Sequence, residues 1–584
     1  MGFETILQGK ISEDDIKKLR EHLEERVWSE TRANWIRWES FENNDFAVWP
    51  SRFKSRPVSR PSTPSFIVAR AVDTQMAFHP SVHRRRNRDT ETGRVQADSV
   101  EPWLREALSR AMRKEMLHSG RQAAHYLIAL GYAVLFGPIP DWKNYVFPPE
   151  RKDFTPDTDG AQAHEQAVKL WEAGQEDWSP FTLRAPHPST VLLDPSERRP
   201  SFGMVIHMMF AGDILYRVNQ RKNRRASRLN QVANFEPRDN PFQEIEVLEF
   251  WSMKEHWLIT EDEGVIVKER NPFGFVPFMQ SFSGWGSTRS GDRGNPANLA
   301  IGILSRIEDG LRREAQEVSG KHNMVTNMSF PPIVTPGNAN DLAGQLAEGG
   351  ILEGWTLNDI GFMQFPNITG DIFRFGEETG RDIEKGSYNQ IASGFRESGV
   401  KTLGEQEILS RATNLKFEAP REGMNDMFSV IASNMLRLAT WFIDNKIANR
   451  IKIAGHEIGA KEIGDRYSVD VDFRVVDPQL ALQEKQSFLV EFQAGLRDKK
   501  SYWEAAGYEN ATQIDRGLAE DQFDAHPAVQ ANRLAEVARL RGMPDVEAGF
   551  KALRDQMLQQ TEAEAEAFNS GQEVGGNGPG PAGS

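Results

Sequence analysis

The chain contains no cysteine among its 584 residues. Disulfide bonds and zinc sites with cysteine ligands are therefore excluded, as expected for folding in a reducing cytoplasm. Long apolar runs are also missing, because stretches such as 132–136 fall far short of the ~20 residues that cross a bilayer. The first residues are mixed or strongly charged, so we expect neither a signal peptide nor a membrane association.

An excess of basic residues is missing as well. The chain has 70 Lys and Arg against 84 Asp and Glu, which gives a formal net charge of −14. Proteins that grip DNA through its phosphates usually carry a basic excess. If this protein handles nucleic acid, it should let the strand slide. The 39% hydrophobic and 26% charged residues indicate a folded, soluble protein, and its length predicts roughly two to four structural units.

Local signatures of catalysis are scarce. The closest match to a phosphate-binding loop is the stretch Gly394–Thr402, but Val400 separates Gly399 from Lys401, and such a loop needs the lysine directly after the glycine. His79 and His83 are four residues apart in a loop-like region without neighbouring carboxylates, which favours surface or packed histidines over metal ligands. The serine-hydrolase pattern G-x-S-x-G does not occur. We therefore predict no enzyme, no cofactor and no metal site.

Two features of the N-terminal part, a tryptophan-containing stripe and an arginine cluster, could each serve either protein packing or nucleic-acid binding. Ser12 and Asp15 predict a capped helix, followed by an apolar stripe that includes Trp28, Trp35 and Trp38. The stripe suits a helix docked on its own or a neighbouring subunit better than a platform for stacking bases. Residues 46–99 are rich in Pro, Ser and Arg and are expected to be extended or loop-like. Their cluster Arg84, Arg85 and Arg86 suits a solvated or intersubunit surface better than a phosphate contact.

Residues 100–295 are typical of a mixed α/β domain. A helix is predicted to begin at Pro102, since proline is tolerated in a first helical turn. Strands are expected near 132–136, 183–194, 203–209 and 244–251, and a hairpin is expected over 257–268.

The most informative pattern follows. A long helix is predicted over Pro296–Asn327, with Leu299, Ile303, Ile307, Leu311 and Val318 on one stripe. A compact α/β insert over 328–369 separates it from a second helix, which is expected from Asp371 to about Ala392.

Beyond the second helix, the sequence predicts a glycine-punctuated loop, Gly394–Gly404, and then a helix over 405–414. An amphipathic helix over Met424–Phe442 and a pair of strands at 451–453 and 469–475 come next. The chain is then predicted to be helical from Pro478 to about Gln560, and a disordered tail is expected over 561–584.

This order of parts resembles the portal, or head-to-tail connector, family of tailed bacteriophages. The aromatic and proline segment Asn271–Phe278 precedes the first long helix, and the insert carries Glu348–Glu353. The loop leads into Gly404–Arg411, and the helical C-terminal region contains Ala494–Gly507. The resemblance covers roughly residues 100–560, and it depends on the order of these motifs.

The resemblance implies an α+β, mainly α fold with a wing, a two-helix stem, a clip and a helical crown. Its implied divisions are an N-terminal arm at 1–99, the wing at 100–295, stem helices at 296–327 and 370–393, the clip at 328–369, a tunnel loop at 394–404, the wing return at 405–477, the crown at 478–560 and the tail at 561–584.

It also implies a ring of twelve copies at one capsid vertex, assembled in the host cytoplasm and carried in the virion, through which double-stranded DNA is packaged and ejected. Implied partners are terminase, tail adaptor proteins and the major capsid protein or scaffold, while ATP hydrolysis belongs to terminase. The implied DNA-facing residues are Gly394, Phe395, Arg396, Glu397, Ser398, Gly399, Val400, Lys401 and Thr402, and those for clip docking are Glu348, Ile351, Glu353 and Trp355. The alternatives are another virion structural protein or a hydrolase whose carboxylates converge only in three dimensions.

Overall fold

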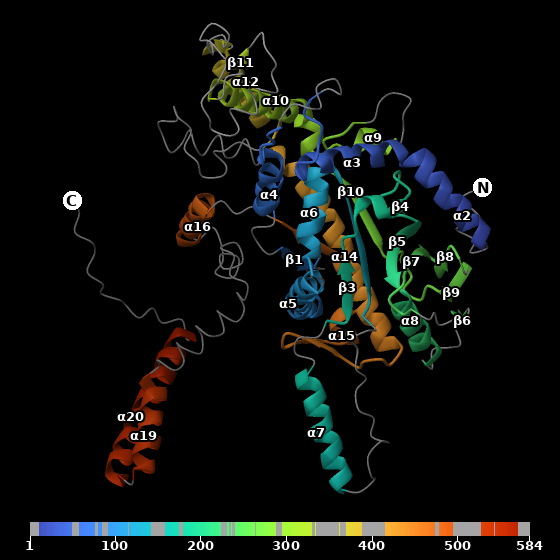
Figure 1. The fold of residues 1–584 in the computed structure, drawn as a ribbon. Helices are drawn as coiled ribbons and strands as arrows, with labels where there is room; N and C mark the ends of the chain where they lie inside the picture. Colours follow the sequence, from blue (N-terminus) through green and yellow to red (C-terminus); the bar gives the residue numbers. More distant parts are fainter. Residues whose placement is uncertain are drawn as a thin grey trace, which may run out of the picture. The chain divides into compact units, whose positions relative to one another are not determined.

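The computed structural model of the chain is α+β and mainly α, as predicted (Figure 1). It describes residues 11–49, 58–75, 80–84, 91–114, 116–141, 158–174, 179–223, 230–232, 235, 240–262, 264–287, 295–329, 333–334, 361–362, 370–387, 415–473, 478–494, 527–541 and 543–569. The chain divides into two compact units, Met1–Val475 and Val476–Ser584, which are described separately.

A three-stranded antiparallel sheet lies at the centre of the first unit. Its order is β10 (Phe278–Phe282), β2 (Tyr132–Pro140) and β3 (Phe181–Arg184). Helices α5 (Glu91–Arg113), α6 (Ser119–Ala129) and α14 (Glu418–Asp444) pack against these strands (Figure 1). Every apolar residue predicted for the buried face of α14 is buried: Met424, Met427, Phe428, Ile431, Met435, Leu438 and Phe442.

A second sheet has six antiparallel strands. Their order is β4 (Val191–Leu193), β5 (Phe202–Phe210), β7 (Glu244–Ser252), β8 (Glu255–Thr260), β9 (Gly264–Arg270) and β6 (Asn230–Val232). The hairpin expected over 257–268 is confirmed as β8 and β9. Helix α8 (Ala211–Asn223) buries Ile214 and Val218 against this sheet. Helix α7 (Thr158–Gly174) and the short turn η4 (Pro188–Thr190) come between β2 and β4 in the chain.

Residues 11–49, the first described stretch of the predicted 1–99 arm and called the N-terminal arm from here on, join the sheets to the rest of the unit. Helix α2 (Glu13–His22) begins with the predicted capping box, since Ser12 and Asp15 bond to each other's backbone N–H. A π-helical turn, η1 (Leu23–Val27), leads into α3 (Ser29–Glu42). Trp28 and Trp35 are each 1% exposed and their rings lie 4.9 and 5.6 Å from that of Tyr132. The tryptophans therefore pack in the core of their own chain.

The described residues of 46–99 do not form only the extended segment that their Pro and Arg content predicted. They contain α4 (Thr63–Gln75), β1 (Ser81–Arg84) and the first turns of α5, which runs through Pro102. Pro102 lies inside this helix and removes one backbone N–H donor, yet the helix continues on both sides of it, from Glu91 to Arg113.

Arg84 is likewise no surface residue. It is 7% exposed and donates to the carbonyl oxygens of Glu462, Ile463 and Arg466. These carbonyls lie at and beyond the end of α15 (Ala460–Ile463), where a cation is favoured by the negative end of the helix dipole. Burial lowers the pKa of the Arg84 guanidinium. Arg85 and Arg86 lie outside the described residues.

The predicted pairing of 451–453 with 469–475 is wrong. Strand β13 (Ile451–Ile453) pairs with β14 (His456–Ile458), while β15 (Val469–Asp472) pairs with β1. A hairpin of adjacent strands closes a much shorter loop than the predicted pair would, so it costs less conformational entropy.

In the second unit, the described helices are α16 (Pro478–Gln493), α19 (Pro527–Leu540) and α20 (Pro544–Asn569). Helix α20 extends past Gln560, so residues 561–569 are helical where a disordered tail was expected. Alanine and glutamate dominate 561–567, and both residues favour helix.

The buried tryptophans of the arm yield a prediction. Replacing Trp35 by alanine removes a ring that packs on Trp28 and Tyr132, so the free energy of unfolding of the first unit should fall by about 3–5 kcal/mol. Chemical denaturation would measure the change. Ile36→Ala is the matched control on the same helix, because Ile36 is 67% exposed and its loss should change stability by less than about 0.5 kcal/mol.

Candidate functional site

The helix–insert–helix unit predicted from the sequence is present as two packed helices. They are α10 (Ile303–Ser329) and α12 (Gly370–Gly386), and we call the pair the stem hairpin (Figure 1). Between them, β11 (Ile333–Val334) pairs antiparallel with β12 (Gly361–Phe362). The sequence predicted that this second helix would continue to about Ala392, whereas α12 ends at Gly386.

The first helix does not run unbroken from Pro296. A short helix, α9 (Pro296–Leu299), ends at Ala300, and α10 begins after Gly302. Gly302 lies directly against the backbone of Ala129 at the end of α6, where an added Cβ would come within 1.9 Å of the Ala129 carbonyl oxygen. This close approach fixes the break, which the apolar stripe gave no means to predict.

Small residues let the two stem helices approach closely. A Cβ added at Gly310 would lie 2.8 Å from Cγ1 of Ile383, and one added at Gly386 would lie 2.6 Å from Cγ2 of Ile307. Further along the pair, the buried hydroxyl of Thr379 donates to Glu317 at 2.8 Å. These contacts join early α10 to late α12, so the helices are antiparallel.

The N-terminal arm and the residues that follow it hold α10 in place through polar contacts. Trp38 donates its indole N–H to Glu308 at 3.3 Å, and Gln316 donates to the carbonyl of Val48 at 2.9 Å. Thr63, in the first turn of α4, donates to Glu314 at 2.8 Å. Burial raises the pKa of the Glu314 carboxyl. The stem hairpin is thus anchored along its first half.

Lys416 anchors the end of α12. Its ammonium donates to the carbonyl oxygen of Lys385 at 3.1 Å, in the last turn of the helix, where orphan carbonyls accept a cation well. Burial, together with the nearby Arg306, lowers the pKa of the Lys416 ammonium. The indole of Trp285 donates to the Lys416 carbonyl at 2.9 Å, so the same residue ties α12 to the segment before α9.

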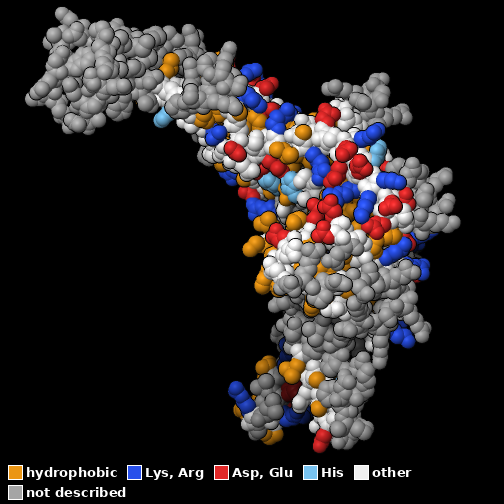
Figure 2. Space-filling model, turned by 45° about the vertical axis from the view of Figure 1, so that its right-hand side comes forward, with side chains coloured by type: hydrophobic (Ala, Val, Ile, Leu, Met, Phe, Trp, Pro, Cys, Tyr) orange, Lys and Arg blue, Asp and Glu red, His pale blue; other side chains and the backbone are white. Residues whose placement is uncertain are grey.

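Charges on the stem hairpin are mixed. Helix α10 carries four acids and four Lys or Arg, and α12 carries five acids and three. The face of the molecule in Figure 2 likewise shows acidic and basic side chains intermixed. Such a surface gives phosphates no continuous row of cations to bind.

The residues named as functional from the sequence lie outside the described residues. This holds for the whole loop Gly394–Thr402 and for the clip residues Glu348, Ile351, Glu353 and Trp355. Their roles stay predictions.

A buried ionic cluster in the six-stranded sheet escaped the sequence reasoning. Glu249 on β7 lies 3.1 Å from His207 on β5 and 3.1 Å from His256 on β8, and His256 also lies 2.7 Å from Glu269 on β9. Trp251 donates its indole N–H to Glu249 at 2.9 Å and stacks on His256 at 3.8 Å. The available signal was a glutamate inside the otherwise apolar strand 247–251.

The cluster perturbs two pKa values in opposite directions. Burial would raise the pKa of Glu249, but hydrogen bonds from His207 and His256 outweigh it and hold the pKa well below its usual value. Burial would lower the pKa of His256, but hydrogen bonds to Glu249 and Glu269 raise it. Perturbed carboxylates often mark active sites. Here each group is paired with another, and the side chains of Glu249 and His256 are only 6% and 1% exposed. The arrangement fits a structural role.

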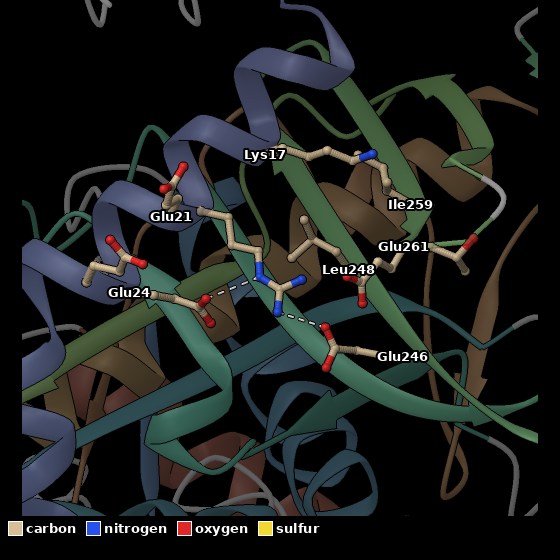
Figure 3. Close-up of a pocket in the computed structure, with 10 residues that line it drawn as sticks. Lys17, Glu21, Glu24, Glu246, Leu248, Ile259 and Glu261 are labelled. Atoms are coloured by element: carbon tan, nitrogen blue, oxygen red, sulfur yellow. Dashed lines mark hydrogen bonds and ion pairs between the residues drawn. The ribbon is translucent and has the colours of Figure 1, made fainter.

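A surface pocket of about 270 Å³ lies between α2 and the six-stranded sheet (Figure 3). Arg20 crosses it to reach Glu246 at 2.7 Å and Glu24 at 3.4 Å. Burial lowers the pKa of Arg20, but these carboxylates outweigh it and raise the pKa. The lining is otherwise largely acidic: Lys17, Glu21, Glu24, Glu25, Glu246, Leu248, Ile259, Thr260 and Glu261. The pocket therefore offers an anion no uncompensated cation.

Across the described part of the chain, no cluster of metal-ligating side chains occurs, and no helix combines the length and apolarity that a bilayer span requires.

Comparisons with known proteins give distant likenesses among solved structures. No family model matches the sequence, and no curated protein matches it. Among solved structures, the chain is similar to a chain from "Neck of empty GTA particle computed with C6 symmetry", with 8% identity and a TM-score of 0.36 over 81% of this chain and 93% of that one. A likeness of this degree carries no argument about function.

The close approach in the stem hairpin yields a prediction. Gly310→Ala should destabilise the first unit by about 1–3 kcal/mol, because the added methyl group meets the buried Ile383. Gly320→Ala is the control on the same helix, since nothing lies within 4 Å of its added Cβ. That substitution should raise the free energy of unfolding by about 0.5–1 kcal/mol through helix propensity alone. Chemical denaturation of both variants would test the packing.

The ionic cluster yields a prediction about pH. The pKa of His256 is raised in the fold, so protonated His256 stabilises the folded state. This contribution is fully present below the ordinary pKa of 6.5 and is lost as pH rises through the raised pKa of the folded protein. Because the pKa of Glu249 is lowered, its stabilisation is present above 4.5 and is lost as pH falls. The free energy of unfolding should therefore fall above pH 6.5 by up to about 1.4 kcal/mol per pH unit.

Denaturation curves between pH 5 and 9 would measure this slope. In His256→Gln the decline should be smaller, whereas the control His456→Gln, at an exposed position, should keep it. Equal slopes in both variants would assign the decline to other groups.

Proposed function

We propose that this chain is a portal protein, the ring-forming connector at one capsid vertex of a tailed bacteriophage. In this proposal double-stranded DNA is packaged and ejected through the ring, which docks terminase first and tail adaptor proteins later. The observation that carries it is the stem hairpin: two antiparallel helices, with the paired strands β11 and β12 between them in the chain. The sequence motifs that resemble the portal family surround this same unit.

The geometry of the stem hairpin suits the wall of a channel. Helix α10 has 27 residues and is therefore about 40 Å long at 1.5 Å per residue, which suits a wall that runs along a channel. Its packing against α12 through Gly310 and Gly386, and its contacts with the N-terminal arm, make it a rigid element. A rigid wall keeps a constant bore while DNA passes.

The electrostatics suit passage without gripping. The chain carries a net charge of −14, and the stem helices mix both signs. A ring of such copies repels the phosphate backbone at long range and binds it weakly at short range, so the DNA slides. In the tunnel loop, Arg396 and Lys401 would make brief phosphate contacts that Glu397 opposes.

We further propose a non-catalytic role. Glu249, a carboxylate whose pKa is held well below its usual value, is enclosed and paired with His207 and His256. A hydrolase would instead need such a group to face a cleft that admits its substrate.

The tunnel loop provides the direct test of the DNA role. Replacing 394–404 with a Gly-Ser segment of equal length should leave rings visible by electron microscopy, because the stem contacts persist. It should reduce DNA packaging or retention in an infection assay, because the phosphate contacts are lost. An equal-length replacement within the C-terminal segment 571–581 serves as the control. Normal packaging by the loop variant would contradict the proposed role.

The insert between the stem helices provides a second test. Combined alanine substitution of Ile351 and Trp355 should abolish terminase binding in a pull-down while rings remain, because apolar anchors dominate protein interfaces. A charge-reversing change at Glu353 should weaken binding less if the apolar pair is the anchor. Undiminished binding in all variants would remove the insert as the docking site.

A further inference from the structure

One face of the six-stranded sheet is covered only in part. Residues that pair directly across two antiparallel strands share a face, so Met208 lies beside Glu246 and Phe210 lies beside Glu244. Helix α2 lies over the neighbouring part of this face, where Arg20 reaches Glu246 at 2.7 Å (Figure 3). Met208 and Phe210 nevertheless remain 61% and 44% exposed.

A further aromatic ring enlarges this exposed area. The rings of Phe210 and Phe242 meet edge-on with their centroids 6.4 Å apart, and Phe242 is 76% exposed. Met208 and Phe210 are two residues apart on one strand, so their side chains lie on the same side of the sheet. We call Met208, Phe210 and Phe242 the apolar patch. Single exposed apolar side chains are ordinary, whereas a contiguous group marks a surface that another molecule covers.

Carboxylates border the apolar patch. They are Glu244 and Glu246 beside it on β7 and, around the pocket under α2, Glu21, Glu25 and Glu261. Glu21 and Glu25 are exposed and form no ion pair with any described residue. The patch is therefore an apolar surface with an acidic border.

The basic residues of the pocket do not offset this negative charge. Lys17 lies 2.7 Å from Glu13, and Arg20 bridges Glu24 and Glu246, so both cations are already paired with carboxylates. A nucleic acid or an anionic membrane surface is repelled here, whereas a basic segment is attracted. Lysine and arginine also carry apolar stems, which can lie along apolar surface while the charged ends reach carboxylates.

We propose that the apolar patch and the acidic pocket beside it dock a basic amphipathic helix of a partner protein. Apolar side chains of that helix pack on the patch, while its Lys or Arg side chains reach Glu21 and Glu25. Helices commonly cover the faces of sheets, and α2 already covers the adjoining part of this one. The surface includes neither the stem hairpin nor the tunnel loop, so the proposal does not rest on the portal function.

The probe is a fluorescent helix-forming peptide of about 18 residues, or five turns, with Leu on one face and Lys and Arg on the other. Its fluorescence anisotropy is followed while the full-length chain is added. Glu21→Lys/Glu25→Lys should weaken binding about tenfold or more, because two attractive charges become repulsive. Glu422→Lys/Asp465→Lys makes the same change in net charge at two exposed positions outside the patch and should leave the affinity unchanged.

The apolar half of the contact gives a second measurement. Met208→Ser/Phe210→Ser should also weaken peptide binding about tenfold or more, because the apolar anchors are lost. Leu170→Ser, at a 75% exposed position of α7, is the matched control and should bind the peptide as the unchanged chain does. Circular dichroism and chemical denaturation would verify that all variants remain folded.

A chain that does not bind the peptide, or binding that both charge variants weaken equally, would overturn the proposal. Equal binding of a peptide with Glu in place of Lys and Arg would overturn it as well. If Met208→Ser/Phe210→Ser instead reduced self-association of the chain in sedimentation experiments, a second copy would be the occupant and the proposal would fail. Rings with an axial channel from a chain that does not bind the peptide would overturn the docking surface and leave the portal function intact.

Discussion

Three indole N–H groups on one short stretch of chain tie the first unit together. Trp28 donates to the Leu193 carbonyl on β4, Trp35 to the Leu130 carbonyl at the end of α6, and Trp38 to Glu308 on α10. Buried N–H groups must find acceptors, and each of these acceptors belongs to a different part of the unit. The N-terminal arm therefore sets where the six-stranded sheet, the central sheet and the stem hairpin lie with respect to one another.

The position of the stem hairpin depends on these contacts of the arm. Helix α10 contacts the arm, Thr63 of α4, and α12, the last through close approaches at glycines. Lys416 and Trp285 then fix the end of α12 to the segment that precedes α9. These contacts hold the helical pair to the rest of the first unit at several points. A firmly held helical pair suits the wall of the proposed DNA channel, and its mixed surface charge is compatible with sliding.

Local patterns predicted the local structure well. The Ser12 capping box, the buried face of α14 and the β8–β9 hairpin depend on residues a few positions apart, and all are present. The features that were missed depend on distant partners. The pairing of β1 with β15, the break at Gly302 against Ala129, and the burial of Arg84 leave no periodic trace in the sequence. The Glu249 cluster joins four strands, and only the lone glutamate in an apolar strand hinted at it. The tunnel-loop and clip residues lie outside the described part of the chain and stay predictions.

Electron microscopy of the assembled full-length chain tests the central claim most directly. If the chain is a portal protein, it will form rings with a continuous axial channel wide enough for a duplex, lined by the stem hairpin α10–α12. Closed or filamentous assemblies without an axial channel, or rings in which the stem hairpin faces outward, would contradict it.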